Sequence, residues 1–247
     1  MQILGIDVGG SGIKGAVVDT QTGELVTERH RFPTPKPSKP KAVAKVFGKL
    51  IEHFEWGGPI GVGFPAPILN GYTKMAANVD DEWLNFPAEE FLSDQTGCAV
   101  TMINDADAAG LAEMRFGAGQ GQQGMVVVIT IGTGLGTVLF SNGVLVPNTE
   151  FGHIEVRGKD AEVRASDAAR KRKHMSWKKW GKHFDEYLNT LEKLLWPDVF
   201  ILGGGGSKKL HKFKKYLTVQ AKVVPAEFLN EAGIVGAALA ALEKPLA

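Results

Sequence analysis

The sequence predicts an α/β protein built as two lobes. Strand-like apolar runs alternate with amphipathic helical segments along the chain. One pattern, in which two apolar strands flank a glycine turn and a further turn and strand follow, starts at residues 5–19 and again at residues 126–140. The chain has 247 residues, 44% of them hydrophobic, which is enough for one large or two compact domains. We expect each copy of the pattern to open one lobe.

The first copy contains a glycine turn that is suited to an anion. Glycines let backbone N–H groups approach a phosphate with no Cβ in the way, and the turn also brings a hydroxyl and an ammonium group. An ordinary hairpin between two buried strands would show the same spacing, so this copy alone leaves both interpretations open. The residues expected at a phosphate are Asp7, Gly9, Gly10, Ser11, Gly12 and Lys14, with Asp7 placed for a water-mediated contact with Mg²⁺.

Because the pattern occurs a second time, a chance occurrence is a much weaker explanation for it. Its strand ends at a turn of two glycines that flank a threonine, followed by another apolar strand. Two such hairpins can present backbone donors to a polyphosphate from two sides. The phosphate-binding residues expected here are Thr130, Gly132, Thr133 and Gly134.

The segments between the two copies predict helices and buried strands in alternation. The proline-rich residues 33–40 form an extended surface connection, and apolar residues at spacings of three and four then predict a helix over 43–54. Short buried strands are expected at 60–64 and 100–103, with a helix over 106–115 after the second one. This alternation predicts a mixed, mainly parallel sheet.

Composition excludes several classes of protein. The single cysteine, Cys98, excludes an internal disulfide and a cysteine zinc cluster, so we expect a reducing, cytoplasmic location. Neither a leader segment nor an apolar run long enough for a membrane span is present, so we expect no export and no membrane partner. The formal net charge is +1, yet residues 168–222 hold 14 Lys and Arg against four acidic residues.

This concentration of positive charge predicts an anionic ligand or a solvated lysine-rich face. Within residues 168–222, Lys208, Lys212 and Lys215 would lie on one face of a helix. The apolar residues would lie on another face, namely Leu210, Phe213 and Leu217. A nucleic-acid partner is not expected, because no aromatic stacking platform is interleaved with the charges. The residues expected to hold a linear polyanion are Arg170, Lys171, Lys178, Lys182, Lys208, Lys209, Lys212 and Lys215.

The chain resembles the ROK (repressor, open reading frame, kinase) group of the actin-like sugar kinases nearly from end to end. Besides both glycine turns, the resemblance rests on residues 61–66, Asn104-Asp105, Glu150 to His153 and the glycine run 203–206. It implies an actin-like, ribonuclease H-like fold with an active-site cleft between the lobes. Residues 76–83, 175–180 and 197–205 resemble the subgroup of glucose kinases that use inorganic polyphosphate.

The resemblance also implies a discontinuous first lobe. In the relatives a final helix returns from the second lobe to the first, and the small-faced apolar residues 232–242 fit such a helix. The segment 117–124, rich in Gly and Gln, is the expected crossing. We expect a first lobe of residues 1–116 and 232–247 with the first turn and the catalytic base, and a second lobe of residues 117–231 with the second turn, sugar ligands and basic cluster.

Asp105 is the expected catalytic base, since the aligned Asp has that role in the family. On the residues alone, Asn104 and Asp105 at a helix start are more typical of a helix cap. The sugar ligands implied by the resemblance are Asn78, Asn104, Asp105, Glu150, His153 and Glu162. The altered loop 156–162 makes Glu162 the least secure transfer, and Ala66 replaces a glycine that is common in the family.

Zinc-containing relatives use the residue matching His153 together with three cysteines from the following loop. Residues 156–162 contain no cysteine, so we expect no structural zinc. The expected activity is transfer of a terminal phosphoryl group from polyphosphate, and also from ATP, to the 6-hydroxyl of glucose with Mg²⁺. A strictly ATP-dependent hexokinase is the alternative, and the family suggests a homodimer. A DNA-binding repressor is not expected, because the first strand starts at Ile3.

Overall fold

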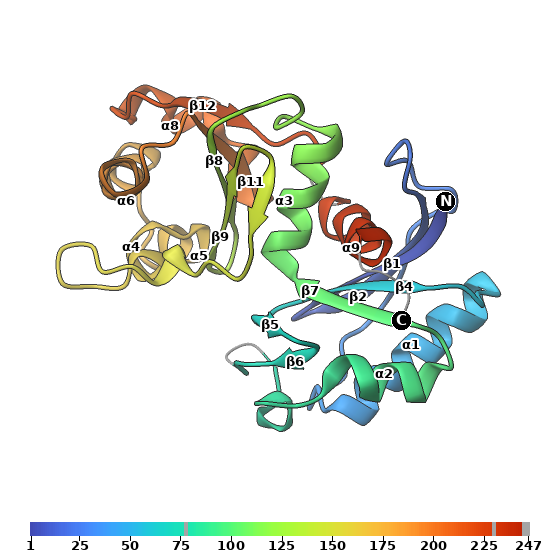
Figure 1. The fold of residues 1–247 in the computed structure, drawn as a ribbon. Coiled ribbons are helices and arrows are strands. Elements are labelled where there is room, and N and C mark those ends of the chain that lie inside the picture. Colours follow the sequence, from blue (N-terminus) through green and yellow to red (C-terminus); the bar gives the residue numbers. More distant parts are fainter. Residues whose placement is uncertain (77–78, 229–230, 244–247) are drawn as a thin grey trace. The chain divides into compact units, whose positions relative to one another are not determined.

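The computed structural model describes residues 1–76, 79–228 and 231–243. The chain divides into two compact units, one formed by Met1–Ala112 and Glu231–Ala247, the other by Glu113–Asn230. Each unit has its own five-stranded sheet and its own hydrophobic core (Figure 1). The division falls inside the helix α3 (Asp105–Phe116).

The sheet of the first unit has the strand order β3-β2-β1-β4-β7. The β1–β2 and β2–β3 pairs are antiparallel, whereas β1–β4 and β4–β7 are parallel. A separate short hairpin joins β5 to β6. The strands are β1 (Gln2–Gly9), β2 (Gly12–Asp19), β3 (His30–Phe32), β4 (Ile60–Phe64), β5 (Ile68–Leu69), β6 (Tyr72–Thr73) and β7 (Val100–Asn104).

Helices cover both faces of this sheet. Figure 1 shows α1 (Pro40–Phe54) and α2 (Ala88–Thr96) on one face and α9 (Ala232–Glu243) on the other. The apolar stripe of α1 is buried in the core, as its spacing predicted. On the opposite face α9 packs backbone against backbone: a Cβ on Gly61 would lie 1.8 Å from the Ala237 carbonyl oxygen. Glycine in β4 and small residues in α9 therefore permit this close contact.

The sheet of the second unit repeats the same arrangement in the order β10-β9-β8-β11-β12. The hairpins β8–β9 and β9–β10 are antiparallel, and β8–β11 and β11–β12 are parallel. The strands are β8 (Met125–Ile131), β9 (Leu135–Ser141), β10 (Val144–Val146), β11 (Val199–Gly203) and β12 (Lys222–Pro225). The predicted duplication is confirmed. The expectation of a mainly parallel sheet is wrong, because each copy contributes two antiparallel pairings to its sheet.

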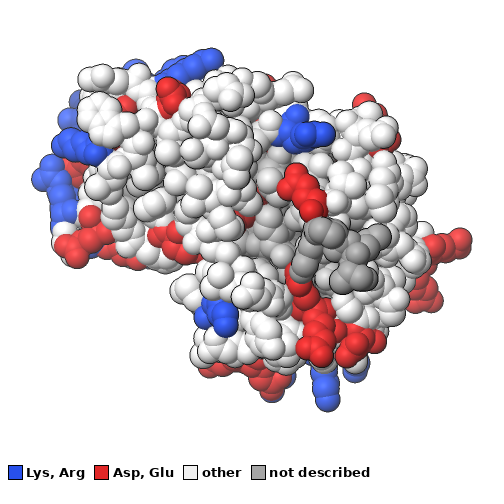
Figure 2. All heavy atoms as spheres, viewed as in Figure 1, with Lys and Arg blue, Asp and Glu red and all other residues white. Residues whose placement is uncertain are grey.

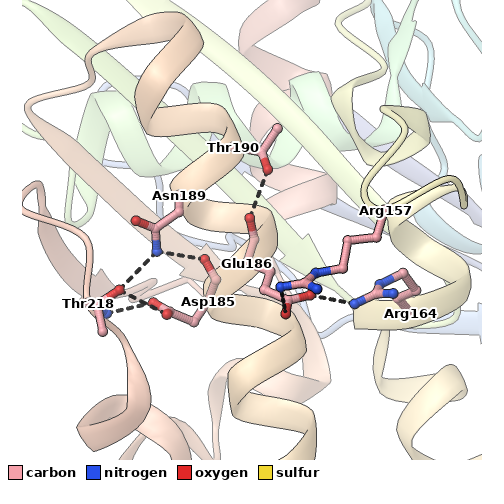
Figure 3. Close-up of polar contacts among 7 residues, drawn as sticks. All are labelled: Arg157, Arg164, Asp185, Glu186, Asn189, Thr190 and Thr218. Carbon is pink, nitrogen blue, oxygen red and sulfur yellow. Dashed lines mark hydrogen bonds and ion pairs between the residues drawn. The ribbon is translucent and has the colours of Figure 1, made fainter.

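The long helix α6 (Trp177–Leu195) forms much of the second core. Its apolar face, including the fully buried Trp180, Phe184 and Tyr187, packs among side chains of the sheet and the neighbouring short helices. Its polar face holds flanking segments in place (Figure 3): Asp185 accepts hydrogen bonds from Thr218, and Glu186 pairs with Arg157 and with Arg164 of a nearby short helix.

The remaining elements of this unit are short. The common helical phase assumed for residues 208–217 is not realised, because the chain breaks there into separate turns. The apolar side chains Leu210 and Phe213 are nevertheless buried. The short elements are η2 (Phe151–His153), α4 (Ala161–Ala165), α5 (Asp167–Arg172), α7 (Gly204–Ser207), α8 (Leu210–Phe213) and η3 (Lys214–Tyr216), and the first unit contains η1 (Asp81–Trp83). Among the described helices, none combines the length and the apolar character that crossing a bilayer requires.

Candidate active site

The first glycine turn joins β1 to β2 and is fixed by side chains around it. Gly9 pairs with Gly12, and two pairs further along the strands Asp7 pairs with Lys14, whose Nζ donates to Asp7 Oδ2 at 3.0 Å. Arg31 donates to the carbonyl of Ser11 in the turn. Two cations therefore lie by the turn together with the Asp7 carboxylate, and the cations favour an anion there.

Neighbouring segments close tightly around this turn. A Cβ on Gly12 would lie 2.2 Å from Arg31 Nε, so that position requires glycine while the arginine stays in place. Thr34 Oγ1 donates to the Gly9 carbonyl at 2.5 Å. A cavity of about 330 Å³ lies beside the turn within the first unit. Its lining includes Val8, Gly9, Gly10, Thr34, Ser38 and Asp80.

The second glycine turn, between β8 and β9, has different surroundings. Gly132 N–H donates to the Gly134 carbonyl at 3.0 Å, which closes the turn on itself. The N–H of Leu135 donates to the Glu162 carboxylate at 3.3 Å. A Cβ on Gly134 would lie 2.3 Å from that carboxylate, so the absence of a side chain lets Glu162 approach. A carboxylate therefore occupies one side of this turn.

Two further segments pack against the second turn. The start of α5 contacts the turn directly, because the N–H of its second residue, Ala168, donates to the Gly132 carbonyl at 3.2 Å. The glycine run after β11 packs on the end of β8, where Gly204 adopts φ +73° and a Cβ on it would lie 2.7 Å from the Ile131 carbonyl oxygen. A residue with a side chain would be strained at that position and would also clash.

Four acidic and imidazole side chains gather beside the second turn. Glu150 precedes η2, His153 is the last residue of η2, and Glu162 lies in the first turn of α4. His153 Nδ1 lies 2.8 Å from Oδ2 of Asp160, whose Oδ1 accepts from the Glu162 N–H at 2.9 Å. The ligating atoms of His153, Asp160 and Glu162 lie within 4.8 Å of one another. The structure thus brings three predicted sugar ligands together and adds Asp160, which sequence reasoning missed.

The cluster shifts the pKa values of two of its members. The hydrogen bond to Asp160 raises the pKa of His153 against the opposing effect of desolvation, and the carboxylates Glu162 and Glu150 raise it further. Desolvation raises the pKa of the Glu150 carboxyl; the charge of His153 lowers it and that of Glu162 raises it. The Glu150 residue as a whole is exposed, so the desolvation concerns its carboxyl end. The raised pKa values favour the protonated forms, and a protonated carboxyl and a protonated imidazole can both donate hydrogen bonds to hydroxyl oxygens.

Asn104 and Asp105 lie where β7 passes directly into α3. Asn104 is buried, and its Oδ1 accepts from the N–H groups of Ala106 at 2.9 Å and Asp107 at 3.1 Å. From the sequence, both Asn104 and Asp105 could cap the helix; in the structure Asn104 caps it. Asp105 is half-buried as the first residue of the helix. Asn78 lies outside the described residues.

The predicted basic cluster forms a surface on the second unit. In Figure 2, Lys and Arg gather along the edge of this unit that carries α6 and α8. We call its members the basic surface: Arg170, Lys171, Lys178, Lys182, Lys208, Lys209, Lys212 and Lys215. Among the described residues, only Arg170 and Lys171 of this set form ion pairs, both with Asp167, at 3.0 and 2.7 Å. Most of the surface therefore carries uncompensated charge.

An aromatic side chain lies among these charges, contrary to the expectation from sequence. The Arg170 guanidinium lies 4.1 Å from the ring centre of Trp177, and Lys212 Nζ lies 5.8 Å from the same ring centre. Phe213 stacks on Trp177 at 6.1 Å. Cation–π contacts thus join α5, α6 and α8 at one residue. Trp177 stands beside Lys178 in the sequence, but its contacts with Arg170 and Lys212 could not be foreseen because these two residues are far apart in the sequence.

Comparison with known proteins identifies the family. Residues 3–166, more than half of the chain, match the family model described as the ROK family. The chain belongs to the ROK family. A protein named polyphosphate glucokinase from Mycobacterium tuberculosis (strain CDC 1551 / Oshkosh) is 47% identical over 240 residues, which is 97% of this chain and 91% of that protein. The protein of the same name from Mycobacterium leprae (strain TN) is 44% identical over 96% of this chain and 74% of its own length.

A solved ROK structure confirms the predicted fold class. The inorganic polyphosphate/ATP-glucomannokinase from Arthrobacter sp. strain KM superposes with a TM-score of 0.93 at 45% identity, over 98% of this chain and 99% of that one. The α/β fold inferred from the repeated pattern is therefore that of the actin-like ROK sugar kinases.

The loop after His153 differs from the cysteine-bearing loop that was described above for zinc-containing relatives. It forms a tight hairpin in which the Val156 N–H donates to the Lys159 carbonyl at 2.8 Å, and Arg157 and Gly158 both adopt positive φ. The hairpin brings Asp160, rather than a cysteine, to His153. In the described part of the chain, His153, Asp160 and Glu162 are the group that offers metal-ligand atoms, and its oxygen-rich set lacks the thiolates typical of structural zinc.

Proposed function

We propose that this protein is a kinase that transfers the terminal phosphoryl group of inorganic polyphosphate to the 6-hydroxyl of glucose, with ATP as a second donor. The observation that carries the proposal is the continuity of α5: it begins on the second glycine turn and ends in the basic surface. A chain of phosphates bound at the turn can therefore continue onto lysines and arginines. The M. tuberculosis relative that matches 97% of the chain is named polyphosphate glucokinase, in agreement with this proposal.

The acceptor side of the reaction is assigned to the polar cluster and to the start of α3. Asp105 accepts the proton of the 6-hydroxyl as the oxygen attacks phosphorus. Asn104 keeps its amide N–H groups for the sugar, since its Oδ1 caps the helix. Glu150, His153 and Glu162 bind the remaining hydroxyls. Asn78 is assigned to the sugar by resemblance.

The donor side is assigned to the two turns and the basic surface. The first turn binds the phosphoryl group that is transferred, through its backbone N–H groups, Ser11 and Lys14. The second turn binds the next phosphates with Thr130, Thr133 and the exposed backbone of Gly132, and the basic surface holds the rest of the polymer.

The first turn fits a magnesium ion bound through water and phosphate. Magnesium keeps most of its waters and is held by one or two carboxylates together with substrate phosphates. Asp7 supplies such a carboxylate at the end of β1, where Lys14 contacts one of its oxygens, Oδ2. When bound, the ion neutralises charge on the phosphates of the donor.

The organisation of the protein is proposed from the same resemblance. The unit with residues 1–112 supplies the first turn and the base, and the unit with residues 113–230 supplies the second turn, the sugar ligands and the basic surface. We also propose a cytoplasmic homodimer that lacks structural zinc. Neither nucleic acid nor a membrane is assigned as a partner.

The proposal is tested by measuring glucose 6-phosphate formation with Mg²⁺ and either long-chain polyphosphate or ATP as the sole donor, at low and high salt. We expect activity with polyphosphate that falls steeply with salt, because several ammonium groups bind the polymer. Activity with ATP alone would replace the proposal with a strictly ATP-dependent glucokinase. Activity with neither donor would contradict both.

A further inference from the structure

Asp160 occupies a junction between the predicted sugar ligands. Its Oδ2 lies 2.8 Å from His153 Nδ1, and its Oδ1 accepts from the Glu162 N–H at 2.9 Å as the N-cap of α4. The Glu162 carboxylate in turn accepts from the Leu135 N–H at the second glycine turn. One side chain is thus linked to two sugar ligands and, through one of them, to the turn.

The backbone holds Asp160 in this position. Asp160 pairs with Glu155 as an antiparallel bridge, and the Ala161 N–H donates to the Ile154 carbonyl at 3.0 Å. At the far end of the hairpin, Arg157 forms an ion pair of 3.0 Å with Glu186 of α6 (Figure 3). Val156 anchors the hairpin in the core, where it is 6% exposed. Asp160 is therefore carried by a braced hairpin and not by a loose loop.

The contact fixes the chemistry that His153 presents. A carboxylate at Nδ1 requires the proton on that nitrogen, which leaves Nε2 to face a ligand in a defined orientation. His153 is 47% exposed, so packing alone leaves its ring free to rotate. Burial raises the pKa of the fully buried Tyr187 hydroxyl, and the charge of Asp160 raises it further.

We infer that Asp160 is a positioning residue that aligns His153 and Glu162 on the sugar; this rests on the proposed function, because it takes those two residues to be glucose ligands. Asp160 itself makes no contact assigned to the reacting atoms. Its removal therefore weakens glucose binding and leaves donor binding nearly unchanged. Loss of orientation at a polar ligand typically costs one to two orders of magnitude.

The test uses variants that separate the contact of Asp160 with His153 from its contact with the Glu162 N–H. Asp160→Ser keeps a good N-cap for α4 but is too short to reach His153. Asp160→Ala loses both contacts. Asp160→Asn keeps the cap through its single amide oxygen but turns an N–H donor toward His153 Nδ1, which reverses the histidine tautomer. Asp185→Asn is the matched control, since Asp185 is a carboxylate of the same unit that also accepts two hydrogen bonds, from Thr218.

Glucose binding is measured by calorimetry without donor, and KM for glucose and for donor by steady-state kinetics. We expect the glucose Kd and KM to rise about 10-fold in Asp160→Ser and in Asp160→Asn, and about 10- to 100-fold in Asp160→Ala, with donor KM within about twofold of wild type. Glucose binding by the serine and alanine variants equal to that of the Asp185→Asn control would overturn the inference. An equal rise in donor KM would also overturn it.

Failure of the proposed function is distinguishable in the same experiments. A wild-type protein that does not phosphorylate glucose contradicts the proposed function, and NMR then decides the positioning claim. We expect the His153 ring nitrogens to shift in Asp160→Ser, and the Leu135 amide to shift as well in Asp160→Ala. Spectra unchanged at both sites would overturn the claim.

Discussion

The two glycine turns share a sequence pattern and a backbone setting but differ in the charge around them. At the first turn, Lys14 lies against Asp7 and Arg31 donates to the turn itself. At the second, the Glu162 carboxylate lies against Gly134 and accepts a hydrogen bond from Leu135. The first turn thus has two cations and the Asp7 carboxylate beside it, whereas the second has the Glu162 carboxylate.

The difference teaches that a repeated motif specifies backbone geometry more strictly than chemistry. Lys14 and Arg31 come from β2 and β3, inside the repeated arrangement, where the second copy carries other residues, whereas Glu162 comes from α4, outside it. Under the proposed function, the cations suit the first turn to the transferred phosphoryl group, and the second turn would link the sugar ligands to the more distant part of the donor.

The largest expected effect is at Asp105, which belongs to neither turn. If the turns bind the phosphate donor and Asp105 accepts the hydroxyl proton, Asp105→Ala lowers kcat about 10²- to 10⁴-fold while glucose and donor still bind. Quenched-flow or coupled assays measure kcat, and calorimetry measures glucose binding. Turnover at the wild-type rate would remove Asp105 from the chemistry.

The next effect separates the two turns directly. Lys14→Met leaves the Asp7 carboxylate without its partner beside the phosphates, so we expect kcat/KM for both donors to fall about 10- to 100-fold. Glu162→Gln keeps an acceptor for the Leu135 N–H, so its effect of about 10-fold should appear in KM for glucose. Identical kinetic profiles for the two variants would break the comparison.

A smaller effect is expected from a methyl group at the second turn. A Cβ on Gly134 would meet the movable end of Glu162, so Gly134→Ala should cost less than about 1 kcal/mol of unfolding free energy and raise KM for glucose. Gly152→Ala is the contrasting variant, because its Cβ would lie 1.9 Å from the Leu135 carbonyl oxygen, which has no room to move. Chemical denaturation should show a loss of more than about 2 kcal/mol there. Equal losses in the two variants would contradict the contrast.

The smallest effect concerns the helix that abuts the second turn. Burial alone would raise the pKa of Asp167, but hydrogen bonds from Lys171 and Arg170 outweigh it and lower the pKa below its ordinary value. The pairs therefore stabilise the fold above the ordinary carboxyl pKa and are lost as pH falls through the lowered one. Asp167→Asn should lower unfolding free energy by about 1 kcal/mol at pH 7 and by much less near pH 3. A difference independent of pH would exclude this ion-pair contribution.

The sequence predicted the parts of the fold that depend on local patterns. The apolar spacing in α1 and the glycine turns at residues 9–12 and 132–134 all led to correct elements. The turns between residues 208 and 217 were missed, because a helical phase shows which side chains are buried but not whether the helix is continuous. The proportion of parallel pairing was misjudged because β2 and β9 each pair antiparallel with a neighbour on both sides.

The site was predictable where a motif carried it and not where partners came from elsewhere. Glu150 and His153 lie three residues apart, so their proximity is local. Asp160 reaches His153 only because Arg157 and Gly158 adopt positive φ and close a tight hairpin, a feature that no spacing revealed. Trp177 joins charges 42 residues apart, from Arg170 to Lys212, through tertiary packing.

The most direct test of the account is the dependence of KM on one charge of the basic surface. Lys212→Glu is compared with Lys222→Glu, an exposed lysine of β12 outside that surface, using polyphosphate and ATP as donors at low salt. We predict that Lys212→Glu raises KM for polyphosphate about 10-fold, changes KM for ATP less than about twofold, and flattens the salt dependence of polyphosphate binding. Equal weakening of both donors, or equal effects of the two lysine variants, would contradict a polyphosphate site on this surface.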